Sequence, residues 1–334
     1  MEIKEIGEFG LIKLLAEGIK LDPNRVVLGI GDDAAVLKQD GSKLLLATTD
    51  TMTEGIHFLF STTSPEQLGY KSLTVNVSDI AAMGGLPTAA LVSLTLPKKI
   101  ECNWVNSLYR GIKEACNVYG VNLVGGDTVS SLGGITLTVT LLGEVEPDCL
   151  IRRSGAKPGD LLGVTGPLGG SAAGLRLLSL ELNRDLKGAE AALARHLKPE
   201  ARLWAGRNLA KTGKVHSLND ISDGLCSEVL EIAEASGVGV VLNARDIPVD
   251  PAAWEIAEYT GDDPLDWALY GGEDYELVFS FSPEGKGEIE AALAEAGCSL
   301  RIIGEIVRDR EKKFINFPDG RLRPLKALGY NHFN

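Results

Sequence analysis

The segment Ile-Thr-Leu-Thr-Val-Thr-Leu at residues 135–141 indicates the fold, because aliphatic residues and threonines alternate through it without a break. Successive side chains of a β-strand point to opposite faces, so this segment would carry its aliphatic residues on one face and its threonines on the other. Aliphatic and β-branched residues also favour extended backbone. The pattern predicts a strand over residues 135–145 with one apolar face.

Further strands and helices are expected around this segment in the first half of the chain. Apolar runs predict strands over residues 44–49, 89–96 and 121–124. A helix is expected over 65–83, because Ser64 can cap its first turn and Gly84-Gly85 can end it. An amphipathic helix is expected over 103–119. The first and last of the three strands lead into the acidic segments Thr48-Thr49-Asp50 and Gly125-Gly126-Asp127.

A turn-rich segment at residues 153–160, dense in Gly, Pro and charge, is typical of a domain boundary. Beyond it we expect strands over 161–165, 238–242 and 275–281 and another that ends at 221. Helices are expected over 171–180 and 225–235 and after residue 199. Both halves therefore mix strands with helices. The predicted fold is α+β (mixed α/β), with an N-terminal domain over 1–148 and a C-terminal domain over 149–334.

Charge and cysteine content exclude several classes of protein. The 334 residues carry a formal net charge of −13, which argues against non-specific nucleic-acid binding but not against a nucleotide held through metal ions. The five cysteines are widely spaced without a Cys-x-x-Cys pair, which disfavours a zinc site or a disulfide framework. Neither a signal peptide nor a run of about 20 apolar residues is found, so we expect a cytoplasmic protein with no membrane partner.

Six segments place an acidic residue beside Gly, Ser or Thr. Small neighbours let a ligand approach the backbone, and carboxylates supply the hard oxygen ligands that divalent cations prefer. A P-loop is excluded, because no Gly-x-x-x-x-Gly-Lys-Ser/Thr segment occurs. Each segment alone is typical of a turn, but the set predicts a site where divalent cations hold a polyphosphate. The segments are Gly31-Asp32-Asp33, Thr48-Thr49-Asp50, Ser78-Asp79, Gly125-Gly126-Asp127, Asp220-Ile221-Ser222-Asp223 and Gly271-Gly272-Glu273-Asp274.

Three other features are ambiguous. Asp79 lies among apolar residues inside the expected helix, where either a metal or a solvated helix face would accommodate it. The glycine-rich loop at 166–170 could bind an anion before a helix, but it is more typical of a tight turn. His57 alone is more typical of a hydrogen-bonded histidine than of a catalyst. The serine-hydrolase elbow and the protein-kinase motif set are both missing.

The order of these motifs resembles a known family. Added to the six segments are Gly7-Glu8-Phe9-Gly10 near the start, the boundary segment at 153–160 and Gly329-Tyr330 near the end. The chain closely resembles the thiamine-monophosphate kinases, over nearly its whole length. Their superfamily also contains aminoimidazole ribonucleotide synthetase, selenophosphate synthetase and a hydrogenase maturation protein. The resemblance implies a homodimer in which two N-terminal sheets pair into a shared barrel, with a nucleotide near the interface and the C-terminal domain completing the site.

The resemblance also implies roles for individual residues. Several Mg²⁺ ions would be bound by Asp33, Thr48, Thr49, Asp50, Asp79, Asp127, Asp220 and Asp223. ATP would contact Tyr109, Gly126, Asp127, Arg153 and Ser222. The second substrate, thiamine monophosphate, would contact His57, Glu273 and Tyr330. Asp32 and Asp274 receive no role from the resemblance and are left as possible structural residues.

The implied reaction is phosphorylation of thiamine monophosphate by ATP to give thiamine diphosphate, by direct in-line transfer assisted by Mg²⁺ and without a general base. Two alternatives stay open. One is another ATP-using enzyme of the superfamily, such as a selenophosphate synthetase-like protein, although no cysteine precedes Cys102. The other is a non-catalytic nucleotide-binding homologue, although every carboxylate of the motif set is present.

Overall fold

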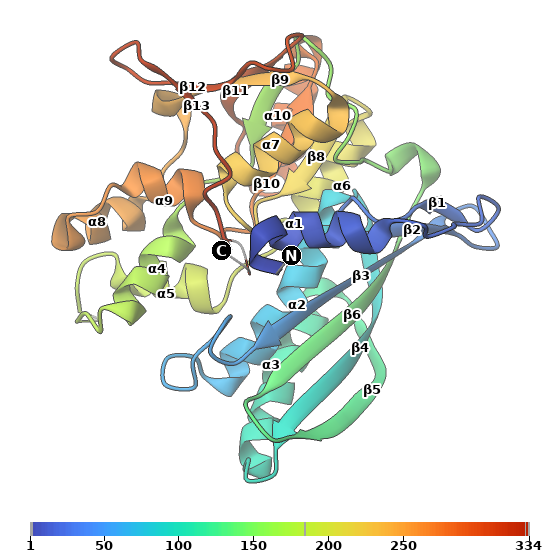
Figure 1. The fold of residues 1–334 in the computed structure, drawn as a ribbon, viewed down its shortest axis with the longest axis vertical. Coiled ribbons are helices and arrows are strands. Elements are labelled where there is room, and N and C mark those ends of the chain that lie inside the picture. The colour runs from blue at the N-terminus through green and yellow to red at the C-terminus, as the bar shows by residue number, and fades with distance from the viewer. Residues whose placement is uncertain (1–2, 184, 331, 333–334) are drawn as a thin grey trace.

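Two β-sheets, each packed against helices, make up the computed structural model, which describes residues 3–183, 185–330 and 332 (Figure 1). The first part of the chain contains α1 (Ile3–Ala16), β1 (Val26–Leu28), β2 (Ala35–Lys38), β3 (Leu44–Thr53), α2 (Pro65–Ala82), β4 (Leu86–Pro97), α3 (Cys102–Tyr119), β5 (Asn122–Ser131) and β6 (Thr136–Val145). A short 3-10 helix, Pro147–Cys149, follows, and the predicted domain boundary falls within it.

The second part of the chain continues from this connection and holds the second sheet. Its elements are β7 (Leu161–Val164), α4 (Gly170–Ser179), α5 (Ala189–Leu197), α6 (Leu203–Thr212), β8 (Val215–Asp220), α7 (Leu225–Ser236), β9 (Gly239–Asn243), α8 (Pro251–Thr260), α9 (Pro264–Tyr270), β10 (Leu277–Phe281), α10 (Lys286–Glu295), β11 (Arg301–Val307), β12 (Lys313–Asn316) and β13 (Leu322–Pro324). None of the described helices is long and apolar enough to span a bilayer.

The first sheet has six strands in the order β1-β2-β3-β6-β4-β5. The alternation predicted for β6 is confirmed, because Leu137, Val139 and Leu141 are fully buried while the threonines between them are half-buried. Helix α2 packs on the face that carries these aliphatic residues. The opposite face is largely open, and β5 lies at the edge of the sheet with most of its residues exposed.

The second sheet has seven strands in the order β13-β12-β9-β11-β7-β10-β8. Most of its pairs are antiparallel, with β12 parallel to β9. Strand β10 is buried at every position, between β7 and β8. This arrangement places the C-terminal end of β8, at Asp220, beside the segment that leads into β10.

Helix α2 connects the two sheets. It packs against α3, β3 and β6 of its own domain and against α6 and β8 of the other. As predicted, Ser64 begins this helix, with a capping box formed with Gln67. The helix ends before Gly84, whose φ of 71° suits glycine. Because α2 is buried on both sides, its polar side chains must find partners within the protein.

Two predicted strand ends are wrong. The sequence placed Asp50 and Asp127 where strands run into loops, whereas both lie inside strands that continue to Thr53 and Ser131. Pairing explains the extension, because β6 pairs with β3 along its full length and β4 with β5. Gly126 permits this close pairing: a Cβ there would lie 1.8 Å from the carbonyl oxygen of Val92.

Candidate active site

A cavity of about 960 Å³ lies between the two domains. Side chains of β3, α2 and α4 line it, together with the loop at 271–275 and residues near the end of the chain. Most of the acidic segments found in the sequence meet at or near this cavity. Both domains therefore contribute to one site.

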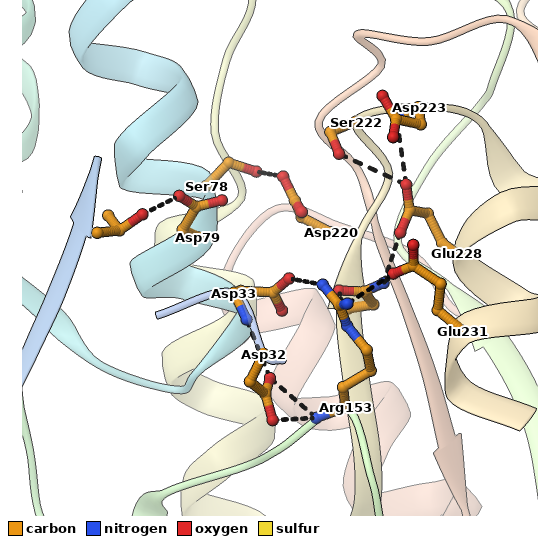
Figure 2. A network of polar contacts seen from close by, with 12 residues as sticks. Asp32, Asp33, Ser78, Asp79, Arg153, Asp220, Ser222, Asp223, Glu228 and Glu231 are labelled. Atoms are coloured by element: carbon orange, nitrogen blue, oxygen red, sulfur yellow. Dashed lines mark hydrogen bonds and ion pairs between the residues drawn. The ribbon is translucent and has the colours of Figure 1, made fainter. Parts of the chain in front are cut away.

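Three carboxylates, those of Asp50, Asp79 and Asp220, line the cavity. Asp33 lies close to them, and we name these four residues the acidic string. Thr48 and Asp50 on β3 point toward α2, where the hydroxyl of Thr48 donates to Oδ2 of Asp79. One residue earlier on α2, Ser78 donates to Oδ2 of Asp220 at 2.6 Å, which ties α2 to the end of β8 (Figure 2). The hydroxyl of Thr48 thus fixes a carboxylate of α2, and that of Ser78 fixes a carboxylate of the other domain beside it.

Arg153 supplies the positive charge next to the acidic string. Its Nη2 lies 2.6 Å from Oδ1 of Asp33, and its Nη1 lies 2.7 Å from Oε2 of Glu231 on α7 (Figure 2). The other oxygen of Asp33, Oδ2, is buried with no hydrogen-bond partner. A buried carboxylate oxygen without a partner is costly, so Asp33 retains an unused capacity to bind a cation or a donor.

Burial and mutual repulsion raise the pKa values of the acidic string. Burial followed by the charge of Asp50 raises the pKa of Asp79 well above its usual value, and burial followed by the charge of Asp33 does the same for Asp220. Burial also raises the pKa of Asp50 to about 6, although a hydrogen bond with Asp79 opposes it. The string thus has more negative charge than Arg153 offsets.

These residues fit divalent cations by their chemistry. Among the described residues, no three His, Cys, Asp or Glu side chains converge closely enough to hold one ion by themselves. The string nevertheless offers hard oxygen atoms, an unpartnered buried oxygen on Asp33 and an excess of negative charge. Cations shared between such carboxylates and the oxygen atoms of a bound phosphate would satisfy all three features.

A second group of titratable residues meets at the cavity, and we name it the Glu273 cluster. Glu273 and His196 line the cavity, and Lys71 contacts Glu273. The Nζ of Lys71 lies 2.7 Å from Oε1 of Glu273, and Nδ1 of His196 lies 3.1 Å from Oε2. Although burial opposes it, the charge of Lys71 and the hydrogen bond from His196 lower the pKa of Glu273 to about 2. This carboxylate is therefore ionised and paired.

The backbone of the loop that carries Glu273 is strained. Glu273 and Tyr275 both have positive φ, 64° and 51°, which is uncommon for residues other than glycine. The loop is held along the 221–222 segment, because the N–H of Glu273 donates to the carbonyl of Ser222 at 2.7 Å and that of Tyr275 to the carbonyl of Ile221 at 2.9 Å. The backbone thus joins the loop that carries Glu273 to the segment that carries Ser222.

The remaining predicted substrate residues, His57 and Tyr330, also line the cavity. Nδ1 of His57 accepts a hydrogen bond from the N–H of Thr53 at 3.0 Å, and its ring lies 5.0 Å from that of His332. The N–H of Tyr330 donates to the carbonyl of Asp223 at 3.2 Å. The end of the chain therefore covers one side of the cavity. Ser222, Asp223 and Thr49 line the cavity as well.

Six predicted residues are not among those that line this cavity. Asp33, Thr48 and Arg153 belong to the acidic string or contact it, whereas the other three lie apart from it. Tyr109 is half-buried on α3, and Gly126 and Asp127 are exposed on β5. Asp127 stands opposite Ser93 of β4, which in turn pairs with Thr138 of β6. Asp127 is therefore on the open, threonine-bearing face of the sheet, whereas the acidic string is on the face covered by α2.

Comparison with known proteins gives the family. Residues 31–145 match the model of the AIR synthase related protein N-terminal domain, and residues 157–315 match that of its C-terminal domain. The thiamine-monophosphate kinase of Bacillus subtilis (strain 168) is 40% identical over 92% of this chain and 94% of its own length. That of Escherichia coli (strain K12) is 38% identical over 98% of each chain. The chain belongs to the thiamine-monophosphate kinase family.

A solved structure supports this assignment. AaThiL complexed with AMPPCP and TMP is 36% identical to this chain and superposes with a TM-score of 0.86 over 99% of both chains. This thiamine-monophosphate kinase family member therefore has the α/β fold of two sheets expected from its sequence.

The structure gives roles to the two acidic residues that the family resemblance left open. Asp32 accepts hydrogen bonds from the backbone N–H of Arg153 at 3.2 Å, which fixes the loop before β2 to the domain boundary. Asp274 accepts from the N–H groups of Gly169 at 2.7 Å and Ser171 at 3.4 Å, at the start of α4. The group that the glycine-rich loop holds is thus a carboxyl group of the protein itself.

Sequence reasoning missed four charged residues at this site in the kinase family member: Lys71, His196, Glu228 and Glu231. Glu228 is buried on α7 and accepts from the side-chain amide of Asn219 and the N–H of Asp223. Lys71 gave no local signal, because Gln67, Lys71, Thr74 and Ser78 recur three and four residues apart, as the polar face of a helix does. For the others, partners distant in sequence left no local pattern.

Proposed function

We propose that this protein transfers the γ-phosphoryl group of ATP to thiamine monophosphate, giving ADP and thiamine diphosphate. One observation carries the proposal: the acidic string and the Glu273 cluster face one cavity in a chain that matches AaThiL complexed with AMPPCP and TMP over 99% of both chains. The string suits phosphate groups bound with cations, and the Glu273 cluster suits the organic part of a substrate. An oxygen of the substrate phosphate forms the new P–O bond as the bond from the γ-phosphorus to ADP breaks.

The acceptor in this reaction needs no general base. A phosphate monoester has its second pKa near 6 and is largely ionised at neutral pH, so no proton must be removed before it attacks. The obstacle is repulsion between two anions. The acidic string would hold Mg²⁺. Thr48, Thr49 and Asp223 are proposed as further ligands of these ions. Bound Mg²⁺ supplies the charge neutralisation and alignment that in-line phosphoryl transfer requires.

Arg153 and Ser222 are proposed to contact ATP. In the structure, both lie at the end of the acidic string, and the guanidinium of Arg153 is paired with Asp33 and Glu231. Binding of cations to these carboxylates would release the guanidinium from its pairs. It could then contact a phosphate in bidentate fashion. Arg153 would therefore balance the string before the nucleotide arrives and bind the nucleotide afterwards.

Asp127, Gly126 and Tyr109 are proposed to act through a homodimer. Asp127 lies on the open face of the sheet, near the edge strand β5. Val129 on the same strand and Leu91 on its neighbour are large apolar residues that are 49% and 41% exposed. An open sheet face with apolar residues and a long edge strand favours pairing with another sheet. In a barrel shared by two chains, Asp127 would join the acidic string of the partner chain.

One experiment separates this function from its alternatives. The purified protein is incubated with ATP, Mg²⁺ and thiamine monophosphate, and thiamine diphosphate and ADP are quantified by chromatography. Equal amounts of both products support the proposal. ATP binding without product would favour a nucleotide-binding homologue. AMP and free phosphate formed with selenide, but no thiamine diphosphate, would favour a selenophosphate synthetase-like enzyme.

A further inference from the structure

Lys71 is a buried cation that the proposed reaction does not use. Its side chain is 5% exposed on α2, yet its Nζ lies 2.7 Å from Oε1 of Glu273 and donates to the carbonyl of His196 at 3.0 Å. Both partners belong to the other domain. Lysine is rarely buried unless it is paired, so this position was built around the carboxylate of Glu273.

Contacts within the protein hold both the side chain and the backbone of Glu273. Its two oxygens contact Lys71 and His196, and its backbone N–H is bonded to Ser222. The ring of His196 is in turn fixed by the hydroxyl of Ser171, 3.0 Å from its Nδ1. The side chain of Glu273 remains 26% exposed, and it lines the cavity. The carboxylate therefore has one free side, which faces the space for the substrate.

Stability does not account for this arrangement. A buried ion pair contributes little compared with apolar residues of the same shape. The positive φ of Glu273 adds a further cost, because it is unfavourable for a residue that is not glycine. Strain combined with a desolvated ion pair, in the wall of a cavity, is typical of a site kept for binding.

We propose that Lys71 and His196 are positioning residues, which hold the carboxylate of Glu273 in the orientation that contacts the thiamine part of the substrate. The inference rests on the proposed function, which puts Glu273 against thiamine monophosphate. Because Lys71 offsets the charge of Glu273, the carboxylate acts as a fixed hydrogen-bond acceptor more than as a counter-ion for the positively charged thiazolium. Lys71 thereby sets affinity for the organic end of the substrate.

The test is a double-mutant cycle on the full chain. Lys71→Met, Glu273→Gln and the double variant are compared with wild type for thiamine monophosphate binding by calorimetry, for KM of both substrates and for Tm. Lys113→Met, at an exposed position of α3, is the matched control. Lys71→Met should raise Kd and KM for thiamine monophosphate by about tenfold. KM for ATP should stay within about twofold, since the acidic string is untouched.

The double variant separates positioning from mere structural support. Removing both charges leaves no unpaired buried ion, so Tm should recover relative to either single variant. If Lys71 acts through Glu273, the double variant is stable yet binds thiamine monophosphate as weakly as Glu273→Gln. A double variant that binds like wild type would overturn the proposal, because stability would then have been the whole effect.

Two further outcomes are decisive. If Lys71→Met does not fold, Lys71→Arg keeps the charge but displaces the carboxylate with its larger planar group, and unchanged affinity in that variant would sink the proposal. Binding is measured directly so that the two ideas can fail separately. Wild-type protein that binds thiamine monophosphate without forming thiamine diphosphate contradicts the proposed function, while the Lys71 cycle still applies. Wild-type protein that binds none of it overturns both.

Discussion

The acidic string and the Glu273 cluster both place carboxylates at one cavity, and the charges around those carboxylates differ. In the string, burial and neighbouring carboxylates raise the pKa of Asp79 well above its usual value. In the cluster, burial is outweighed by Lys71 and His196, which lower the pKa of Glu273 to about 2. Burial alone therefore does not decide the state of a carboxylate; the charges built around it do. The acidic string requires cations from solution, whereas the Glu273 cluster contains its own cation, Lys71.

The largest expected effect comes from removing a carboxylate from the string. Asp79→Asn should lower kcat/KM by about 10³-fold, as expected when a group that stabilises transition-state charge is lost. The variant should stay folded, and its Tm in EDTA should not fall, because a repelling charge has been removed. Steady-state kinetics and thermal melts measure both. Asp40→Asn, at an exposed position, is the control, and near wild-type activity in Asp79→Asn at limiting Mg²⁺ would refute the role of the string.

The next effect tests Arg153, whose guanidinium lies beside the string. Arg153→Met leaves Asp33 and Glu231 without their partner, so the free energy of unfolding in EDTA should fall by about 3 kcal/mol. Mg²⁺ should stabilise this variant more than it stabilises wild type, because it binds the same unpaired carboxylates. Urea denaturation with and without Mg²⁺ gives both values. Arg245→Met, whose side chain is 76% exposed, should change neither, and equal Mg²⁺ effects in Arg153→Met and wild type would contradict the prediction.

A third prediction asks whether one chain holds the complete string. Asp127→Asn and Asp79→Asn should each be inactive alone. If Asp127 serves the partner chain, unfolding and refolding an equal mixture should restore about a quarter of wild-type activity, because half of the dimers are mixed and each of these has one intact site. No recovery in a mixture shown to contain mixed dimers would place Asp127 in the site of its own chain, and an Asp127→Asn variant that is active alone would place Asp127 outside the reaction.

The fourth prediction concerns pH. Burial raises the pKa of Asp50 to about 6 and that of Asp223 to about 7, both above the unfolded value of 3.8. The folded state thus binds more protons in this window, and its stability is lost as pH rises through these values. Glu273 has the opposite sign, because its lowered pKa stabilises the fold above pH 4.5 and this is lost only as pH falls toward 2.

Thermal melts in EDTA from pH 5 to pH 8 measure this effect. Tm should fall as pH rises, by on the order of 2–4 °C for each kcal/mol lost, and saturating Mg²⁺ should flatten the curve. Asp79→Asn should also flatten it, since that variant carries one fewer raised carboxylate. A Tm that rises steadily across this range in EDTA would show that the string is not the dominant titrating group.

The smallest effect is expected at the carboxylate next to Glu273. Burial raises the pKa of Asp274 to about 8, so its side chain is largely neutral at pH 7, and it accepts two N–H groups at the start of α4. Asn keeps an acceptor oxygen there. Asp274→Asn should therefore change the free energy of unfolding by less than about 1 kcal/mol and leave the dependence of activity on Mg²⁺ unchanged. A large loss of Mg²⁺ affinity would move Asp274 into the metal site.

Local patterns predicted the elements better than the partners. The alternation in β6 and the capping box of α2 are visible in the sequence because their causes lie within a few residues. The ends of β3 and β5 were predicted too early, because a neighbouring strand extended them past Asp50 and Asp127. Helices α1, α5, α8, α9 and α10 and strands β1, β2 and β11–β13 were not predicted.

At the site, too, local patterns predicted the residues better than their partners. The acidic residues were found through motifs, and the family resemblance grouped them, yet nothing local distinguishes Glu273 from Asp274. Their difference comes from Lys71 on α2 and the start of α4, which are remote in sequence. Motif order grouped Asp127 with the string, whereas within a single chain Asp127 lies on the opposite face of the first sheet. Long-range contacts, and the side of a sheet on which a residue falls, were beyond the sequence pattern.

Helix α2 carries both Lys71, which pairs with Glu273, and Asp79 of the acidic string, with no interruption between them. Eight residues of α-helix span about 12 Å along its axis. The helix thus sets the distance between the Glu273 cluster and the acidic string. This distance fixes how far the organic end of a substrate can lie from the phosphate that reacts. A shorter phosphate ester could contact one of these two groups but not both, so the protein would select its substrate by length as well as by charge.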